Sequence, residues 1–192
     1  MIERVMAQAG LAPTQLDAVA AALGPGGFTG IRVGLAAAHG IALAVGARLI
    51  GITSFAAVAA QIAGTGHPAC QSLLVALDSR RADLYVQLFA GDAASPLAPP
   101  QALLAAQLAL YVARRGLRSL LIAGDAAEAA SAALGGPARC AVVADSAPDA
   151  RGVAAAALAE LRSGAMPGPV RPLYLRPPDV TLPKRPPPAP LA

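Results

Sequence analysis

The order of the predicted elements indicates an α/β protein of two small lobes. In the first third of the chain, apolar strand-like runs alternate with segments of helical periodicity, which is the pattern of a parallel sheet covered by helices. A break rich in glycine and proline follows, and a hairpin-like pair of strands then opens a second series of strands and helices. We therefore expect a first lobe over residues 1–66, a second lobe over 67–165 and a proline-rich tail over 166–192 that docks in part at 172–178.

The first lobe is predicted from two consecutive strand-to-helix units. The run 16–23 is apolar and too short for a stable helix, which favours a buried strand. Glycines follow this run, and the next segment has apolar residues spaced by three and four. Ser54 offers a hydroxyl that could cap the second helix. The expected elements are a helix over 1–9 that ends at Gly10, strands over 16–23 and 49–52, and helices over 29–45 and 54–63.

The second lobe is expected to begin with a hairpin. Strand-like runs over 73–77 and 84–89 flank a polar stretch, as in two antiparallel strands joined by a turn. Prolines dominate the tail and prevent regular backbone hydrogen bonding, so only 173–176 resembles a strand there. The other expected elements are a loop over 91–100, helices over 101–115, 125–134 and 149–163, and strands over 118–123 and 141–143.

The composition favours a cytoplasmic protein without a membrane span. Hydrophobic residues make up 56% of the chain. The longest apolar run, 33–47, is interrupted by His39 and is shorter than the roughly 20 residues that a spanning helix needs. No basic segment followed by an apolar stretch and a cleavage site opens the sequence. The two cysteines, Cys70 and Cys140, have no ligand-like neighbours, so neither a disulfide nor a zinc site is expected.

The net charge of +4 includes a basic cluster in the tail. This cluster indicates an acidic partner at that end of the chain. Aromatic residues make up only 3% of the sequence, which argues against a dedicated RNA-binding surface, because such surfaces stack bases on aromatic rings. The basic residues of the tail are Arg171, Arg176, Lys184 and Arg185.

The densest motif is GPGGFTGIRVG at residues 24–34, between a predicted strand and a predicted helix. The exposed amides of such a loop could bind a phosphate. A tight strand-to-helix turn needs small residues for steric reasons alone, and the motif has neither the Lys-Ser/Thr ending of a P-loop nor a G-x-G-x-x-G spacing. Both interpretations are compatible with the sequence.

Small residues recur every four positions along two faces of the helix predicted over 29–45. Such rows let helix backbones approach closely, and each interior glycine costs about 1 kcal/mol relative to alanine, so a packing gain must offset it. One face can cover the sheet and leave the other for a second protein; alternatively, both faces are buried within this chain. The residues predicted for a partner interface are Phe28, Gly30, Ile31, Arg32, Gly34, Leu35, Ala38, His39 and Ala42.

The turn that follows the predicted strand 73–77 brings together two carboxylates and two guanidiniums. Asp78 and Asp83 could flank a glycosidic bond or hold a metal. The alternative is that they accept hydrogen bonds from turn amides and pair with the neighbouring arginines. His39 has no carboxylate or thiol near it in sequence, and no Ser-His-Asp pattern is recognisable, so no catalytic, cofactor-binding or metal-binding residue is expected. The residues singled out in this turn are Asp78, Arg80, Arg81 and Tyr85.

Three segments together resemble the TsaB (YeaZ) family: GPGGFTGIRVGLAAAHGIALAVGA at 24–47, LDSRRADLYV at 77–86 and PLYLRPP at 172–178. The resemblance implies a two-lobe actin/Hsp70-like ATPase (ribonuclease H-like) fold. It also implies a non-catalytic dimerization subunit that pairs with the transferase TsaD, while TsaE completes the assembly and a homodimer is an alternative. TsaD transfers a threonylcarbamoyl group to adenosine 37 of tRNAs that read codons starting with A. This chain would therefore meet tRNA only indirectly, and a nucleotide at the partner interface is compatible with the resemblance.

The sequence departs from its relatives at two places. TsaD carries an H-x-x-x-H metal pair just after the next strand, where this sequence has GITSF at 51–55. No metal ligand stands there, which separates a scaffold subunit from the catalytic one and argues against the older glycoprotease interpretation of the superfamily. Family members typically open with a strand resembling I-L-A-I-D-T-S, whereas residue 1 already lies in a later helix. The first lobe is thus expected to lack its N-terminal strands, through a mis-set start codon or a true truncation.

Two other classes of function are alternatives. A small-molecule phosphotransferase of the same fold needs two phosphate loops and a catalytic carboxylate, but here the first loop is absent and the second carries arginines. A membrane-surface protein needs a helix with a polar face rich in Lys or Arg, which the segment 29–45 lacks.

Overall fold

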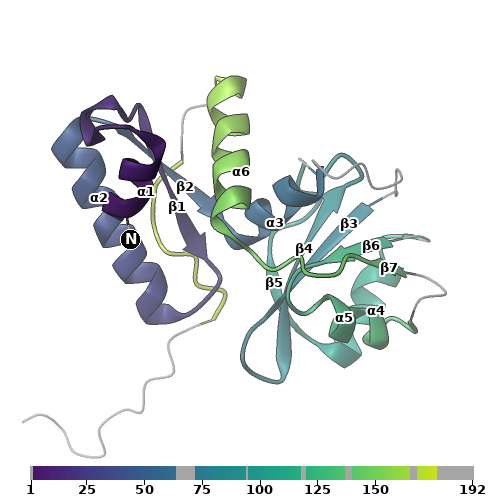
Figure 1. Cartoon of the computed structure of the whole chain (residues 1–192). Coiled ribbons are helices and arrows are strands. Elements are labelled where there is room, and N and C mark those ends of the chain that lie inside the picture. The colour runs from purple at the N-terminus through teal and green to yellow at the C-terminus, as the bar shows by residue number, and fades with distance from the viewer. Residues whose placement is uncertain are drawn as a thin grey trace, which may run out of the picture.

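The computed structural model describes residues 2–63, 72–93, 95–117, 120–136, 140–164 and 168–176. It contains a parallel two-stranded sheet and a mixed five-stranded sheet (Figure 1). The predicted boundary near residue 66, Cys70, and the tail with Lys184 and Arg185 lie outside the described residues.

The two-stranded sheet is a single strand–helix–strand unit. β1 and β2 pair in parallel, with Ala18 opposite Arg48 and Ala22 opposite Ile52. A parallel pair requires a crossover, and the long helix α2 supplies it. The elements of this part are α1 (Ile2–Ala9), a 3₁₀ turn (Pro13–Gln15), β1 (Ala18–Gly24), α2 (Phe28–Val45), β2 (Arg48–Thr53) and α3 (Ser54–Ala63).

The five-stranded sheet has the strand order β5-β4-β3-β6-β7. Its first three strands form an antiparallel meander, and β6 and β7 then add in parallel on the other side of β3. The elements are β3 (Ser72–Asp78), β4 (Asp83–Ala90), β5 (Gln101–Leu104), α4 (Ala105–Ala113), β6 (Leu120–Ala123), α5 (Ala127–Ala133), β7 (Cys140–Val142) and α6 (Ala150–Ser163).

Most of the predicted elements are confirmed, but the helix predicted over 101–115 is wrong in its first turn. Gln101–Leu104 is the edge strand β5, in which Gln101 pairs with Val86 and Leu104 with Asp83. The helix begins only at Ala105, where the backbone amide of Leu104 donates to Gln107 Oε1 over 3.0 Å. Strand pairing with β4 overrides the helical spacing, because β4 offers an unsatisfied edge at that position.

Two smaller expectations also differ from the structure. The cap at the start of α3 is Thr53, whose Oγ1 accepts from the amide of Ala56 over 3.0 Å. Ser54 instead donates its hydroxyl to the carbonyl of Pro25 over 2.9 Å, because its side chain points back to the loop after β1. Residues 173–176 form no strand; the segment bends at 175–176 and has one backbone hydrogen bond from Leu173 N to Leu23 O over 2.8 Å.

Helices α3 and α6 lie between the two sheets (Figure 1). α4 and α5 cover one face of the five-stranded sheet, and α3 covers the other. α6 follows the second sheet in sequence, but its Ala156 and Ala157 pack with Ile50, Ile52 and Ala57 of the first part. The remaining face of the β1–β2 sheet is covered by α2. The two sheets therefore share the α3–α6 layer.

The α3–α6 contact depends on a close approach of backbones. A Cβ atom added at Gly152 would lie 2.4 Å from the carbonyl oxygen of Ala57. Asp149 begins α6 by accepting from the amides of Arg151 and Gly152, each over 2.9 Å, and it also accepts from Gln61 Nε2 of α3 over 2.6 Å. The start of α6 is thus fixed on α3 by steric fit and by hydrogen bonds.

We predict opposite effects of the same substitution at two helical glycines. Gly152→Ala gains at most about 1 kcal/mol of helix propensity, but a steric clash with a backbone oxygen costs more, so the free energy of unfolding should fall by about 1–2 kcal/mol. At Gly40 in α2, nothing lies within 4 Å of the position of an added Cβ atom. Gly40→Ala should therefore raise the free energy of unfolding by up to about 1 kcal/mol. Urea unfolding of both variants tests this, and equal signs would contradict it.

Candidate functional site

The segment 168–176, which we call the strap, connects two of the hydrophobic cores. Val170 packs against the core formed by β1 and α2, which includes Leu35 and Ala38. Leu173 and Leu175 pack against the core between α3 and the five-stranded sheet. In Figure 1 the strap runs as a yellow trace beside β1. It therefore buries apolar side chains in both parts of the molecule.

Polar contacts of the strap join the three segments that carry the family resemblance. Arg32 of α2 donates from Nε to the Tyr174 hydroxyl over 2.8 Å. Arg176 forms an ion pair with Asp83 at the start of β4. Together with the bond from Leu173 N to Leu23 O, these contacts hold the loop after β1, the turn between β3 and β4 and the strap against one another.

Burial and hydrogen bonding shift the pKa of Asp83 in opposite directions. Its side chain is 7% exposed, and this desolvation alone would raise the pKa of the carboxyl. The hydrogen bond from the Ser79 hydroxyl and the ion pair with Arg176 outweigh it and lower the pKa below the ordinary 3.8. Asp83 is thus held ionised by its partners.

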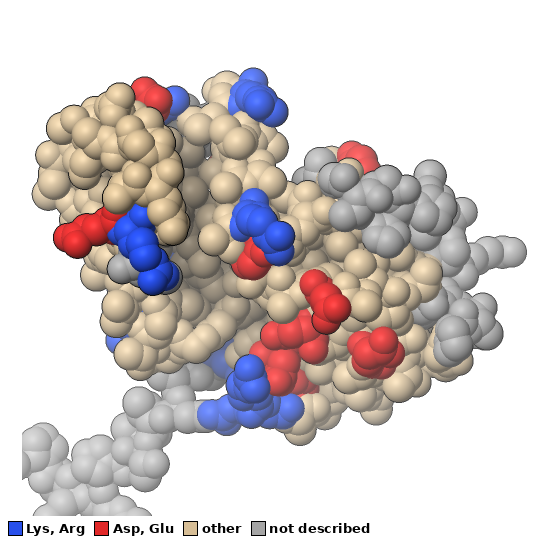
Figure 2. All heavy atoms as spheres, viewed as in Figure 1, with Lys and Arg blue, Asp and Glu red and all other residues tan. Residues whose placement is uncertain are grey.

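Polar groups of the β3–β4 turn form hydrogen bonds with one another. Asp78 Oδ1 accepts from the amide of Arg80 over 2.7 Å, and Asp78 Oδ2 lies 3.4 Å from Arg80 Nε. The Ser79 hydroxyl bonds to Asp83 Oδ1 over 2.6 Å. The amide of Asp78 donates to Asp125 Oδ1, 2.8 Å away at the end of β6. Figure 2 shows acidic and basic side chains gathered together over one region of the second lobe.

These carboxylates serve the turn and the ion pair in the way expected of structural aspartates. Within the described ranges, no group of three or more His, Cys, Asp and Glu side chains is placed to hold a metal ion. Tyr85, which was singled out with the turn, is partly buried and packs into the core beneath it.

The glycine loop between β1 and α2 is a tight turn with a defined steric requirement. Gly24 has φ = 97°, and a Cβ atom there would lie 2.7 Å from Ile31 Cδ1. The Pro25 carbonyl is held by the Ser54 hydroxyl. The close turn explains the glycine at position 24, whereas nothing lies within 4 Å of an added Cβ at Gly27. Phosphate binding by the loop amides stays a hypothesis.

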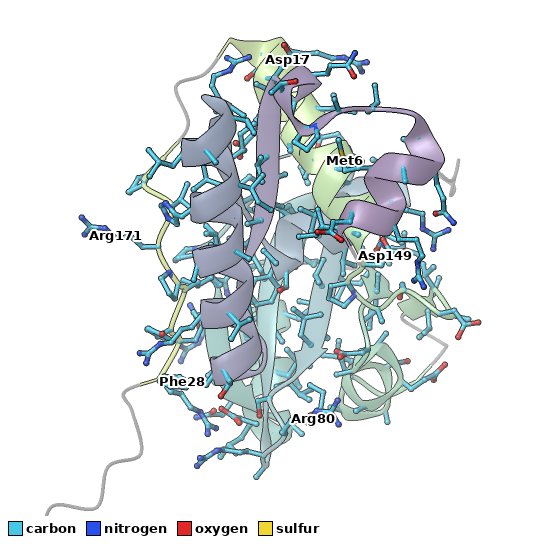
Figure 3. The ribbon with its side chains drawn as sticks, turned by 60° about the vertical axis from the view of Figure 1, so that its left-hand side comes forward. Met6, Asp17, Phe28, Arg80, Asp149 and Arg171 are labelled. Carbon is cyan, nitrogen blue, oxygen red and sulfur yellow. The ribbon has the colours of Figure 1, made fainter. Side chains whose placement is uncertain are left out.

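An aromatic and cationic cluster sits where this loop meets the strap. The Phe28 and Tyr174 rings are 5.8 Å apart and tilted by 30°. The Arg32 guanidinium carbon lies 3.7 Å from the centre of the Phe28 ring and 5.7 Å from that of Tyr174. Figure 3 shows Phe28 at the end of α2 next to the strap. We call these three residues the aromatic patch.

The residues predicted for a partner interface divide between the two sides of α2. Leu35, Ala38 and Ala42 are buried against the chain's own β1–β2 sheet, and Ile31 is partly buried with them. They are core residues here, because a sheet-covering helix turns its largest apolar stripe inward. Phe28, Gly30, Arg32, Gly34 and His39 are exposed.

The exposed side of α2 is centred half a turn away from the buried stripe. It is uncharged and consists mostly of small residues; we call it the outer face of α2. Only Val33 and Leu43 on it are large, and they are 63% and 87% exposed. Sequence reasoning missed several of its members, since two rows of small residues give no sign of which row the sheet covers. The outer face comprises Thr29, Val33, Ala36, Ala37, Gly40, Leu43 and Ala44.

By length and composition alone, α2 is long and apolar enough to cross a membrane. A core helix of a soluble protein passes the same test, so the observation is weak evidence. One side of α2 packs on a β-sheet in this structure.

Comparison with known proteins agrees with the fold and the motifs. The family model "TsaD: tRNA N6-adenosine threonylcarbamoyltransferase" matches residues 1–132. The "tRNA threonylcarbamoyladenosine biosynthesis protein TsaB" of Haemophilus influenzae is 39% identical over 85 residues, which are 44% of this chain and 35% of that protein. Its Escherichia coli namesake is 33% identical over 85 residues, 44% of this chain and 36% of that protein. The chain thus spans about a third of the length of the curated relatives it matches.

A solved structure is similar over most of the fold. The "Crystal structure of an uncharacterized protein with similarity to peptidase YEAZ from Pseudomonas aeruginosa" matches with a TM-score of 0.75 at 20% identity, over 92% of this chain and 81% of that chain. Such a match confirms the predicted α/β fold. The family model covers most of the chain and defines its class as a TsaD-type α/β domain. Within that class, the chain is similar to proteins of the TsaB (YeaZ) family.

The Asp83–Arg176 ion pair should make stability depend on acid pH. Because the pKa of folded Asp83 lies below 3.8, its contribution is complete above that value and is lost as the pH falls through the lower folded pKa. Asp83→Asn should lower the free energy of unfolding at pH 7 by about 2–3 kcal/mol and flatten the dependence below pH about 4. Denaturant unfolding at a series of pH values measures both effects. Asp17→Asn, at an exposed position, is the control, and equal losses in the two variants would contradict the prediction.

Proposed function

We propose that this chain is a non-catalytic partner subunit of a TsaD-type transferase, in the formation of the threonylcarbamoyl group on adenosine 37 of tRNA. The observation that carries the proposal is the outer face of α2, which is exposed, uncharged and built of small residues. A helix of a folded domain usually turns a polar face to solvent, so an apolar outer face indicates that a second surface covers it.

The chemistry of the outer face fits a second helix. Gly40 lies at its centre, and nothing stands within 4 Å of the position of a Cβ there. Flanking alanines leave the backbone accessible, so a partner helix could approach closely and gain dispersion contacts along its length. Leu43 and Val33 would supply apolar anchors at either side. The partner suggested by the family is TsaD, and a second copy of this chain would meet the same steric requirement.

Helix α1 offers a second apolar surface. It has no buried residue, and its Ile2 and Val5 are exposed. In Figure 3, α1 and α2 lie on opposite sides of β1, so this surface is separate from the outer face of α2.

A non-catalytic role is supported by the way in which residues 51–55 are used. TsaD carries its metal-binding histidines at the corresponding place, whereas here Thr53 caps α3, Ser54 holds the Pro25 carbonyl and Phe55 is fully buried. These side chains build the junction between the β1–β2 sheet and α3. In the proposed assembly TsaD performs the transfer, TsaE joins the complex, any nucleotide lies at the partner interface, and the location is the cytoplasm.

We predict that Gly40→Leu weakens association with the cognate TsaD-type subunit by at least about tenfold, because the added side chain separates the two backbones. The substitution should not destabilise the free chain, since its site is open and leucine is the better helix former. Co-purification and sedimentation with the partner measure association, and thermal unfolding measures stability.

Ala155→Leu on the exposed side of α6 is the matched control, because it adds similar bulk to a helix away from α2. If both Gly40→Leu and Ala155→Leu associate with the partner as strongly as the unchanged chain does, the interface lies elsewhere. Gly40→Ala, which adds a single methyl group, should retain most of the affinity.

A further inference from the structure

We infer that the aromatic patch of Phe28, Arg32 and Tyr174 binds single-stranded RNA directly. The inference goes beyond the proposed function, because a subunit that supports a transferase need not touch RNA itself. It also departs from the expectation that this chain meets tRNA only indirectly, which rested on the low aromatic content.

The few aromatic residues of the chain are distributed unequally. It has three phenylalanines, three tyrosines and no tryptophan. Phe55, Phe89 and Tyr111 are buried, and Tyr85 is partly buried. Phe28 and Tyr174 are 53% and 47% exposed and lie in contact with each other. The two most exposed aromatic rings thus lie at one place, although they come from segments far apart in the sequence.

Internal packing does not account for leaving both rings half in solvent. Burying an aromatic side chain contributes strongly to stability, and an exposed pair with an arginine is typical of a binding hot spot. Arg32 stacks over Phe28 and donates Nε to Tyr174, which fixes both rings in place before any ligand arrives. A preorganised patch loses little side-chain entropy on binding.

The segments 24–47 and 168–176 that form the patch contain arginines but no Asp or Glu, which favours an anionic ligand. The acidic β3–β4 turn also contacts the strap, but its Asp83 is paired with Arg176 and its Asp78 with Arg80. Arg32 is exposed, and its guanidinium has four N–H donors besides the one on Nε. Arg171 is exposed on the same strap, and Figure 3 shows it pointing away from the strap into solvent, on the side where Phe28 lies. Arg176, by contrast, is committed to Asp83.

Flat apolar rings next to guanidinium groups are the combination that binds unpaired nucleotides. A base stacks on an aromatic face, and the neighbouring phosphates contact arginines. A protein partner that binds the uncharged outer face of α2 would not need the arginines of the patch. The patch lies at the N-terminal end of α2, beside this outer face, so RNA and a protein partner could bind at the same time.

The test measures binding of the full chain to a fluorescein-labelled single-stranded oligoadenylate, to the same sequence in a duplex, and to an unmodified tRNA transcript. Fluorescence anisotropy at several salt concentrations gives the affinities. We expect the single strand and the tRNA to bind and the duplex to bind more weakly, because its bases are not free to stack. Phe28→Leu and Tyr174→Leu remove a ring but keep an apolar side chain, and each should weaken binding by about tenfold.

Two arginine variants separate a local contact from a general charge effect. Arg171→Ala should weaken binding and lower the slope of log affinity against log salt by about 0.7, the value for one phosphate of a single strand. Arg48→Ala removes the same charge from an exposed position at the opposite end of the β1–β2 sheet and should leave both quantities unchanged. Tyr174→Phe keeps the ring and should retain most of the affinity.

Several results would overturn the inference: no binding at low salt, equal affinity for single strand and duplex, ring variants that bind as the unchanged chain does, or equal losses in Arg171→Ala and Arg48→Ala. Ring variants that keep RNA affinity but lose capture of the TsaD-type subunit would assign the patch to the protein interface and would also overturn it. Phe28→Leu decides the question if Tyr174→Leu unfolds, because Phe28 contacts the strap only through its ring, whereas Tyr174 is part of the strap and accepts the hydrogen bond from Arg32. The Gly40 variants test partner binding separately, so the two proposals fail independently.

Discussion

The insertion of the strap between two small cores is the interaction on which the rest of the structure depends. A two-stranded sheet is marginally stable by itself, because it has too little apolar surface to offset the entropy of ordering its residues. The β1–β2 sheet overcomes this by packing against α2, α6 and the strap. The strap contributes Val170 to that core and Leu173 and Leu175 to the other. Neither sheet is therefore an independent unit in this structure.

Helix α2 shows how one apolar element can have two different roles. Its buried stripe combines Leu35 and the partly buried Ile31 with the small Ala38 and Ala42, which pack against the sheet. Its outer face is made of small residues, which fill little space and leave the backbone open to a neighbour. The first arrangement favours folding of this chain, and the second favours association with another chain. The glycines that weaken the helix are tolerated because packing on the sheet compensates for their low propensity.

The acidic residues at the ends of the strands mainly stabilise the fold. Asp78 accepts from the turn amide, Asp83 pairs with Arg176, Asp125 accepts from the amide of Asp78, and Asp149 caps α6. Each carboxylate is matched by a specific donor, which keeps charge close to the surface of the core without an unsatisfied group. The two most exposed aromatic rings lie with Arg32 at the aromatic patch, whereas exposed arginines occur over much of the surface. The carboxylates that support the fold are thus distinct from the aromatic groups that remain available for binding.

The sequence by itself determined the secondary structure of most of the chain and the family. Periodicities of two and 3.6 report which residues face a core, so the strand–helix units and the β3–β4 hairpin were predictable from local pattern. Pattern could not distinguish a helical first turn from the edge strand at Gln101–Leu104, because pairing with β4 is a non-local interaction. Only the tertiary structure decided which face of α2 is buried, since two rows of small residues look alike until a sheet covers one of them. It also decided that Phe28, Arg32 and Tyr174 meet: the contact closes a loop of more than a hundred residues, and no local signal records such an approach.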